Sequence, residues 1–388
     1  MGVGRFVFTP IVPLMHTQAR LSPGAGAHLA TANYVGYLVG ALAGILAPSL
    51  ARSSALLRAS LVVLIAGLAA MPLTHSTALW MALRLLAGVA SALVFVIAVS
   101  PLLSRLREHP AHLPGWAFGG VGAGIALSGL LVLAVLSFAD WRAAWWASAA
   151  LAALLTVLAW NLRPEAAPEQ SGATARPEPA DGLVRRARTG RWFSALFASY
   201  TLEGVGYIVA GTFLVAAIEQ GSPGWIGSGA WVVVGLAALP SSAVWAWLGR
   251  RWSRPGLLCA ALVIQAVGIA LPALFDSVPA ALVSAVLFGA TFIGISTLAL
   301  ATGAHLRFPR SVALLTAGYS VGQILGPLLV APLLQHGYRQ ALLSASGVVL
   351  VAAVSAAVLR SGFPHQIVMA HSGTPTVRRC AAPKGRVG

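Results

Sequence analysis

GVGRFVFTPIVPLM, residues 2–15, begins with the same Gly-Val-Gly as a stretch in the second half of the chain. That stretch is GVGYIVAGTFLVAA, residues 204–217. A second pair of stretches is also similar. VGAGIALSGLLV at residues 121–132 resembles VGQILGPLLV at residues 321–330 when a two-residue gap is allowed. Similar stretches at corresponding places are typical of a duplicated helical unit. The sequence therefore predicts two equivalent halves.

The composition is that of a membrane protein. Of the 388 residues, 58% are hydrophobic and only 9% are charged, whereas about a quarter of a soluble domain is charged. The apolar residues form runs close to the ~20 residues that cross a hydrocarbon core of ~30 Å, and backbone satisfaction in lipid makes such runs helical. The chain is therefore predicted to be an all-α polytopic membrane protein. The predicted spans are 25–46, 56–73, 78–103, 115–138, 143–162, 192–218, 225–248, 256–275, 278–304, 312–334 and 340–359, after the short opening stretch.

A polar segment separates the two sets of spans. RPEAAPEQSGATARPEPADGLVRRARTGR, residues 163–191, is rich in Pro, Ala, Gly and charge, as flexible linkers are. We therefore expect a six-helix lobe at 1–162, a linker at 163–191, a second six-helix lobe at 192–361 and a disordered tail at 362–388. The predicted architecture is two pseudo-symmetric six-helix bundles.

The basic residues predict the orientation. If the linker is cytoplasmic, most of the 25 Lys and Arg residues lie in the linker, in the tail and in loops on the same side, such as those of Arg52, Arg105, Arg250 and Arg307. This bias places both termini in the cytoplasm. The formal charge of +16 then requires no nucleic acid, because the basic residues edge apolar segments rather than cluster on one face.

The opening stretch is shorter than its counterpart. RWFSALFASYTL, residues 191–202, precedes Glu203 and the second Gly-Val-Gly, whereas only Met1 precedes the first. A helix ending near His16 covers about 22 Å of a core of about 30 Å. We expect the natural protein to begin upstream, so that the first helix is shortened here. The alternative is a signal-peptide hydrophobic region, but the stretch lacks a basic beginning and a cleavage site of small residues.

The opening stretch, LSPGAGAHLATANYVGYLVGAL at residues 21–42 and DWRAAWW at residues 140–146 resemble the YbfB/YjiJ-type permeases of the major facilitator superfamily. The superfamily resemblance covers nearly the whole chain. It implies two six-helix lobes in a bacterial inner (plasma) membrane. It also implies that the first, fourth, seventh and tenth helices line a central cavity that opens alternately to either side.

One loop pattern departs from the superfamily. The signature after the second helix, a Gly followed by Asp-Arg and further basic residues, is here GILAPSLARSSALLR, residues 44–58, without an acid. Its counterpart after the eighth helix, LGRRWSRPGLL at residues 248–258, also has none. We expect gating to depend on other contacts.

Glu203 is the only acidic residue predicted to lie deep in a span. It lies about 17 Å along the seventh helix, near the middle of the bilayer, where a charge costs at least about 2.5 kcal/mol. We hypothesise that Glu203 is a proton-coupling carboxylate that faces a water-accessible space between the lobes. The alternative is a structural ion pair or a hydrogen-bonded neutral acid.

Two arginines lie within predicted spans. Arg5 is about 15 Å from the outer end of its helix and either contacts the substrate or forms a permanent pair with Glu203. Arg84 is about 9 Å deep. We expect its side chain to extend to the outer surface; the alternative is that it holds an anionic substrate at the outer gate.

Other polar and aromatic residues of the spans complete the candidate binding site, since pockets for small molecules combine aromatic faces with a few polar anchors. For each of them, helix packing or interfacial anchoring is the alternative. The predicted substrate-binding residues besides the two arginines are Asn33, Tyr34, Tyr37, Tyr207, Tyr319 and Gln323, and Tyr200, Phe292 and Ser296 are further candidates.

Two glycine-rich stretches lie within predicted spans, GGVGAGIALSG at 119–129 and GYSVGQILGP at 318–327. They are not phosphate loops, because no strand precedes them and no Lys-Ser/Thr follows. Small residues at such spacing let helices approach and slide, and proline bends a helix. They also resemble the superfamily's gating signature in the fifth helix. The predicted gating residues are Gly120, Gly122, Gly124, Gly318, Gly322, Gly326 and Pro327.

These features predict a secondary active transporter of a small organic solute that works by alternating access with coupling to protons. Its expected partners are the solute, protons and the lipid bilayer. The alternative is a membrane sensor or partner-binding protein on the same fold. An enzyme is not expected, because no catalytic set or nucleotide motif is present. The two cysteines, Cys259 and Cys380, and the scattered histidines predict no metal site or cofactor.

Overall fold

The computed structural model of the chain describes residues 2–47, 53–105, 112–135, 139–161, 181–221, 224–306, 308, 310–361 and 363. All secondary structure in these residues is helical, and ten helices are long and apolar enough to cross a membrane. The all-α polytopic fold is therefore confirmed. The elements are α1 (Gly2–Phe6), α2 (Phe8–Gln18), α3 (Pro23–Leu46), α4 (Ser54–Ala70), η2 (Met71–Leu73), α5 (Thr77–Arg105), α6 (His112–Val135), α7 (Trp141–Ala159), α8 (Asp181–Gly221), α9 (Ile226–Leu248), α10 (Arg254–Leu274), α11 (Val278–Leu306), α12 (Ser311–Val330), η4 (Leu333–His336) and α13 (Tyr338–Arg360).

Each predicted span corresponds to one long helix from α3 to α13, and the starts of several are fixed by side chains. The Ser22 hydroxyl accepts a hydrogen bond from the Ala25 N–H at 3.2 Å, with Pro23 in the first turn of α3. The Asp140 carboxylate accepts one from the Ala143 N–H at 3.0 Å before α7. Such caps satisfy N–H groups that have no partner within the helix.

The helix α8 begins earlier than predicted. The linker was expected to extend to residue 191, but α8 already starts at Asp181. Leu, Arg and Ala of this stretch favour helix, and extending an existing helix costs far less than starting one. The polar composition of residues 181–191 therefore does not interrupt α8. Residues 163–180 of the expected linker, and the expected tail apart from Phe363, lie outside the described residues.

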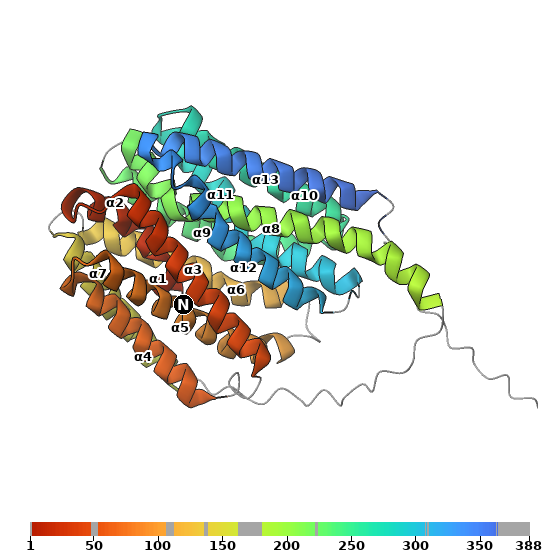
Figure 1. Ribbon diagram of the computed structural model, residues 1–388, viewed down its shortest axis with the longest axis horizontal. Coiled ribbons are helices and arrows are strands. Elements are labelled where there is room, and N and C mark those ends of the chain that lie inside the picture. Colours follow the sequence, from red (N-terminus) through yellow and green to blue (C-terminus); the bar gives the residue numbers. More distant parts are fainter. Residues whose placement is uncertain are drawn as a thin grey trace, which may run out of the picture.

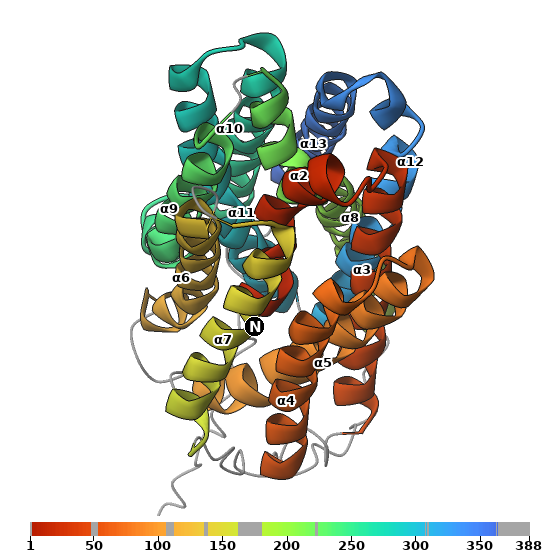
Figure 2. The same cartoon turned by 90° about the vertical axis from the view of Figure 1, so that its left-hand side faces the viewer.

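The opening stretch forms two short helices that meet at Val7. Pro10 has no N–H to donate to the Phe6 carbonyl, which explains the interruption. Gly2 is buried against α6, where a Cβ on Gly2 would lie 2.8 Å from Cα of Gly124. Figure 2 shows α2 close to α8, with which it packs.

The two halves of the chain lie side by side (Figure 1). We call α1–α7 the N-terminal lobe and α8–α13 the C-terminal lobe. The apolar part of α8, Thr189–Gly221, is mostly buried inside the protein, whereas only a minority of the apolar segment of α7 is. Among the described helices, α8 is thus the central helix of its lobe, and it carries Glu203 and Tyr207.

The lobes meet where α6 packs on α9 and α3 packs on α12. Glycine permits the first contact: a Cβ on Gly122 would lie 2.6 Å from the Leu239 backbone N and 2.8 Å from the Gly235 carbonyl oxygen. Real Cβ atoms do not approach backbone so closely, so a side chain at Gly122 would push the helices apart. Gly120, on the same helix, has no heavy atom within 4 Å of such a Cβ.

We predict that Gly122→Ala lowers the thermal unfolding temperature of the full-length protein in detergent by several degrees. Overpacking of this kind costs about 1–3 kcal/mol. Gly120→Ala is the matched control and should leave the temperature unchanged or raise it, because Ala favours helix over Gly. Intrinsic tryptophan fluorescence on heating measures both variants. Equal unfolding temperatures for the two would contradict the packing described for α6 and α9.

Candidate functional site

Arg5 of α1 lies between the lobes and bonds across to the C-terminal lobe. Its Nη2 donates a hydrogen bond to Oε1 of Gln323 on α12, and its side chain is only 7% exposed. Its Cζ lies 4.1 Å from the ring centre of Tyr37 and 5.4 Å from that of Tyr34, both on α3. The structure thus brings together four predicted binding residues. We call Arg5, Tyr34, Tyr37 and Gln323 the central site.

The charge of Arg5 is not neutralised by these neighbours. Aromatic faces attract a cation by about 0.5–2 kcal/mol, but they carry no net charge. The amide of Gln323 is also neutral, and Nε of Arg5 has no hydrogen-bond partner. Burying a charge costs free energy unless the charge is paired. Arg5 is therefore a buried cation that a bound anion would stabilise.

Arg84 of α5 is a second buried cation. Its side chain is 2% exposed, its Cζ lies 4.4 Å from the ring centre of Phe8, and its Nε and Nη1 have no hydrogen-bond partner. The expectation that it extends to the outer surface is wrong. Trp80, one turn nearer that end of α5, is buried as well.

Asn33 of α3 lies beside Arg84. Its Nδ2 donates to the Arg84 backbone oxygen at 2.9 Å, and its side chain is fully buried. Its Oδ1 has no partner. Asn33 therefore bonds α3 to α5 and has one unsatisfied acceptor.

Arg84 lies within electrostatic range of Arg5, and both lie within range of Tyr34. In the described part of the chain, no acidic side chain hydrogen-bonds to either of them. Repulsion between like charges and the cost of burial both favour an anion between or beside the guanidinium groups. This arrangement can bind a carboxylate or another oxyanion.

A stack of aromatic rings lies on the C-terminal side of the central site. Tyr200 and Tyr207 of α8 flank Tyr319 of α12, with ring centres 4.4 Å and 5.5 Å from its own. Tyr207 also stacks on Phe292 of α11 at 5.6 Å. The predicted residues Tyr207 and Tyr319 are thus in contact. We call Tyr200, Tyr319, Tyr207 and Phe292 the aromatic stack.

Hydrogen bonds close the lobes on each other beyond the central site. The Thr9 hydroxyl donates to the Gly211 carbonyl oxygen at 2.6 Å. The Thr212 hydroxyl donates to the Ile208 carbonyl oxygen at 2.7 Å, so Tyr34 donates to Thr212 in their 2.9 Å contact. α8 is thereby bonded to both α2 and α3. Sequence reasoning missed both threonines, because nothing in the sequence pairs these positions.

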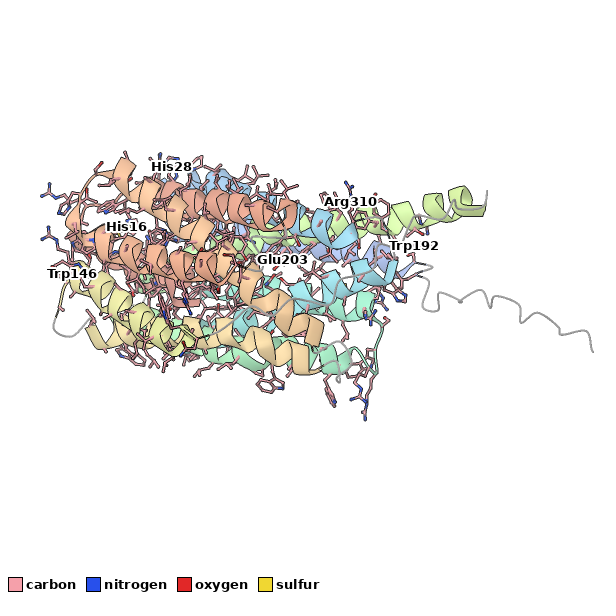
Figure 3. The ribbon with its side chains drawn as sticks, turned by 90° about the horizontal axis from the view of Figure 1, so that it is seen from below. His16, His28, Trp146, Trp192, Glu203 and Arg310 are labelled. Atoms are coloured by element: carbon pink, nitrogen blue, oxygen red, sulfur yellow. The ribbon has the colours of Figure 1, made fainter. Side chains whose placement is uncertain are left out.

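A histidine joins the lobes at the end of α2. Nδ1 of His16 bonds the Leu21 carbonyl oxygen, which only accepts, so this nitrogen carries the proton. Nε2 of the neutral ring then accepts from the Tyr338 hydroxyl at 2.9 Å, at the start of α13. Figure 3 places His16 at the same end of the bundle as His28 and Trp146. Sequence reasoning missed this contact too.

Glu203 lies about midway along the bundle (Figure 3) and is fully buried. Nε2 of Gln265 on α10 donates to its Oε1 at 3.4 Å. Its Oε2 and the Oε1 of Gln265 have no partner. The one polar side chain of a largely apolar span, Gln265, was the signal in the sequence that was overlooked.

Two expectations for Glu203 are wrong in this structure. It forms no permanent pair with Arg5, because Gln323 is bonded to the arginine and Gln265 to the acid. Neither Glu203 nor Arg5 faces an open, water-accessible space, since both are buried with the lobes closed over them. The acid instead lies within the C-terminal lobe, in electrostatic range of Tyr200 and Tyr319.

The predicted gating glycines lie mostly at close helix contacts. A Cβ on Gly318 would meet the Thr201 hydroxyl at 2.5 Å, and one on Gly326 would meet the Val205 carbonyl oxygen at 2.5 Å, both on α8. Gly322 faces α8 as well, Gly122 faces α9, and Gly124 faces Gly2. Pro327 lies buried inside α12, and Gly120 has open space around it. Their gating role stays a prediction.

A known protein family resembles this chain in sequence, and solved structures resemble it in fold. The family described as "Uncharacterised MFS-type transporter YbfB" matches residues 1–358. No curated protein matches the sequence. Among solved structures, a mutant of the nucleoside transporter NupG has a TM-score of 0.70 at 14% identity, covering 92% of this chain and 98% of that one. NupG itself has a TM-score of 0.66 at 14% identity, covering 92% and 96%. Such likeness at low identity shows the fold.

We predict that His16 and Tyr338 are energetically coupled in holding the lobes together. Tyr338→Phe removes one hydrogen bond, worth about 0.5–1.5 kcal/mol, and should shift the lobes toward separation at this end about two- to tenfold. Spin labels at positions 28 and 339, in a background with Cys259→Ser and Cys380→Ser, measure the distance distribution. His16→Ala and the double variant complete a double-mutant cycle. Additive effects of the two substitutions would refute the coupling.

Proposed function

The chain belongs to the family described as "Uncharacterised MFS-type transporter YbfB". We propose that it moves a small organic anion across the membrane by alternating access, coupled to protons. The carrying observation is the pair of buried guanidinium groups that bond to no acid in the described part of the chain. The two-lobed fold supplies the means of alternating access.

The anion would bind at the N–H groups that have no partner. Nε of Arg5 and both Nε and Nη1 of Arg84 are unsatisfied, and guanidinium groups bind carboxylate and phosphate oxygens with charge-assisted hydrogen bonds. Each such bond offsets the free-energy cost of burying the guanidinium charge. The Tyr34 ring contacts Arg5, Asn33 bonds the backbone of Arg84, and both residues would shape the site.

Binding at Arg5 would also act on the lobes. The bond from Arg5 to Gln323 joins α1 to α12 and is one of the links between the lobes. An anion that takes over the guanidinium competes with Gln323 for it. Solute binding would therefore weaken one interlobe contact and supply another, which is how a ligand shifts a two-state equilibrium.

Glu203 and Gln265 would form the proton site. A neutral acid avoids the cost of a buried charge. A proton on Oε2 of Glu203 also has an acceptor available, because Oε1 of Gln265 is unsatisfied. The acid and the amide would then share two hydrogen bonds. Loss of that proton places a negative charge behind the aromatic stack, which disfavours an anion at the central site.

We predict that Arg5→Gln lowers transport of organic anions at least a hundredfold in proteoliposomes of the full-length protein. Loss of a charge-assisted contact and its replacement by a neutral amide account for an effect of this size. A panel of mono- and dicarboxylates measures it, with exposed Arg20→Gln as the control for a simple change in net charge. Undiminished anion flux in Arg5→Gln would refute the proposed binding role.

We predict that solute affinity falls as pH rises in the parent protein and is independent of pH in Glu203→Gln. The amide can still pair with Gln265, so the variant should fold and retain solute counterflow while losing proton movement. A pH-sensitive dye inside the vesicles reports the proton. If Glu203→Gln kept the parent's pH response, Glu203 would not be the proton site.

A further inference from the structure

We propose that the transported anion is aromatic, with a flat ring that packs on the aromatic stack and an acidic group that meets Arg5. This inference rests on the proposed function and adds the chemical class of the solute. A pair of phenylalanines elsewhere in the described part of the chain, discussed below, serves as the comparison.

The tyrosines of the chain are concentrated around the central site. The chain has six tyrosines. Five of them belong to the central site or the aromatic stack, and the sixth, Tyr338, bonds His16 across the lobes. Tyrosine offers a flat apolar face and a polar edge, which suits a ligand with the same two characters.

The faces of the stack are nearly parallel across three helices. The ring planes differ by 12° between Tyr200 and Tyr319, by 12° between Tyr207 and Tyr319, and by 5° between Tyr207 and Phe292. Isolated aromatic pairs adopt both edge-to-face and offset-stacked arrangements. Phe288 of α11 also stacks on Tyr207 and on Phe292, with planes 17° and 13° apart. A flat ring packs on parallel faces of this kind by offset stacking.

The stack and the cation are adjacent. Phe6, next to Arg5 in the chain, makes an edge contact with Phe292 at 6.3 Å, and Cζ of Arg5 lies 5.3 Å from the Phe6 ring centre. Gln323, which accepts from Arg5, follows Tyr319 by one turn on the same face of α12. One turn rises about 5.4 Å. A carboxylate attached directly to a ring, or one or two atoms away, matches this separation.

A purely structural stack looks different in this protein. Phe193 and Phe308 stack at 4.1 Å with planes 5° apart. That pair consists of two phenyl rings and includes no hydroxyl. In the aromatic stack three of four rings carry a hydroxyl, and it lies beside a buried cation with a free N–H. Packing alone does not require either feature.

Three probes of similar size test the inference by calorimetric titration and competition on the full-length protein. Benzoate carries ring and charge, cyclohexanecarboxylate carries the charge without the flat ring, and benzamide carries the ring without the charge. We expect benzoate to bind about tenfold more tightly than cyclohexanecarboxylate, from the loss of ring contacts, and benzamide to bind more weakly than benzoate.

The outcomes separate this inference from the proposed function. Equal affinity for the two acids would overturn the aromatic class and leave anion transport standing. Equal affinity for benzoate and benzamide would overturn the anion role of Arg5, on which the inference rests. Absence of binding by all three probes would overturn both.

Variants of the stack give a second test. Tyr207→Leu should reduce the preference for benzoate over cyclohexanecarboxylate to near unity, whereas Tyr207→Phe should retain it. Tyr319→Leu, at a less buried ring of the same stack, should repeat the result if Tyr207→Leu does not fold. Phe193→Leu is the control in the separate pair and should keep the parent's preference. A parallel loss of affinity for both acids in the leucine variants would overturn the inference.

Discussion

Two guanidinium groups are buried, that of Arg5 between the lobes and that of Arg84 within the N-terminal lobe, and the described part of the chain bonds neither to an acid. Guanidinium cannot lose its proton in a protein, so the charge persists whatever the surroundings are. The neighbouring groups lower the free-energy cost of burying these charges. Aromatic faces lie beside both arginines, and the Gln323 amide oxygen bonds Arg5. Asn33, which bonds the Arg84 backbone, has an unsatisfied amide oxygen. The proposals for an anionic solute, for the role of Gln323 and for the aromatic ring all follow from this imbalance of charge.

The two lobes supply different chemistry to the space between them. The N-terminal lobe provides the cations, on α1 and α5. The C-terminal lobe provides the aromatic stack, on α8, α11 and α12, and the buried acid behind it. Under the proposed function a solute needs its charge recognised by one lobe and its ring by the other. Glu203 takes no direct part in that recognition and acts through the charge that it presents to the stack.

The sequence was sufficient for the fold, because apolar runs of membrane length and a repeated Gly-Val-Gly are local signals. It failed at the start of α8, where a polar composition hid a continuing helix. It named Arg5, Tyr34, Tyr37 and Gln323 as candidates, and the structure brings them together. The superfamily resemblance did not predict that grouping, because it assigns the first, fourth, seventh and tenth helices to the cavity, whereas the tyrosines and Gln323 lie on the second and eleventh. Sequence reasoning failed for Arg84 and for the partner of Glu203. Depth in a span does not reveal which side chains of other helices cover a residue, and Gln265 lies on a helix that no local pattern links to Glu203.

The length of α8 has a mechanical consequence. At 41 residues the helix extends about 60 Å and projects past its neighbours at one end (Figure 1). The Thr9–Gly211 and Tyr34–Thr212 hydrogen bonds hold α8 to the N-terminal lobe nearer its opposite end. About 45 Å of helix separates these contacts from Asp181, so a tilt of about 5° about them becomes a displacement of about 4 Å at that end. Small adjustments around the held part would thus be magnified where the chain leaves the bundle.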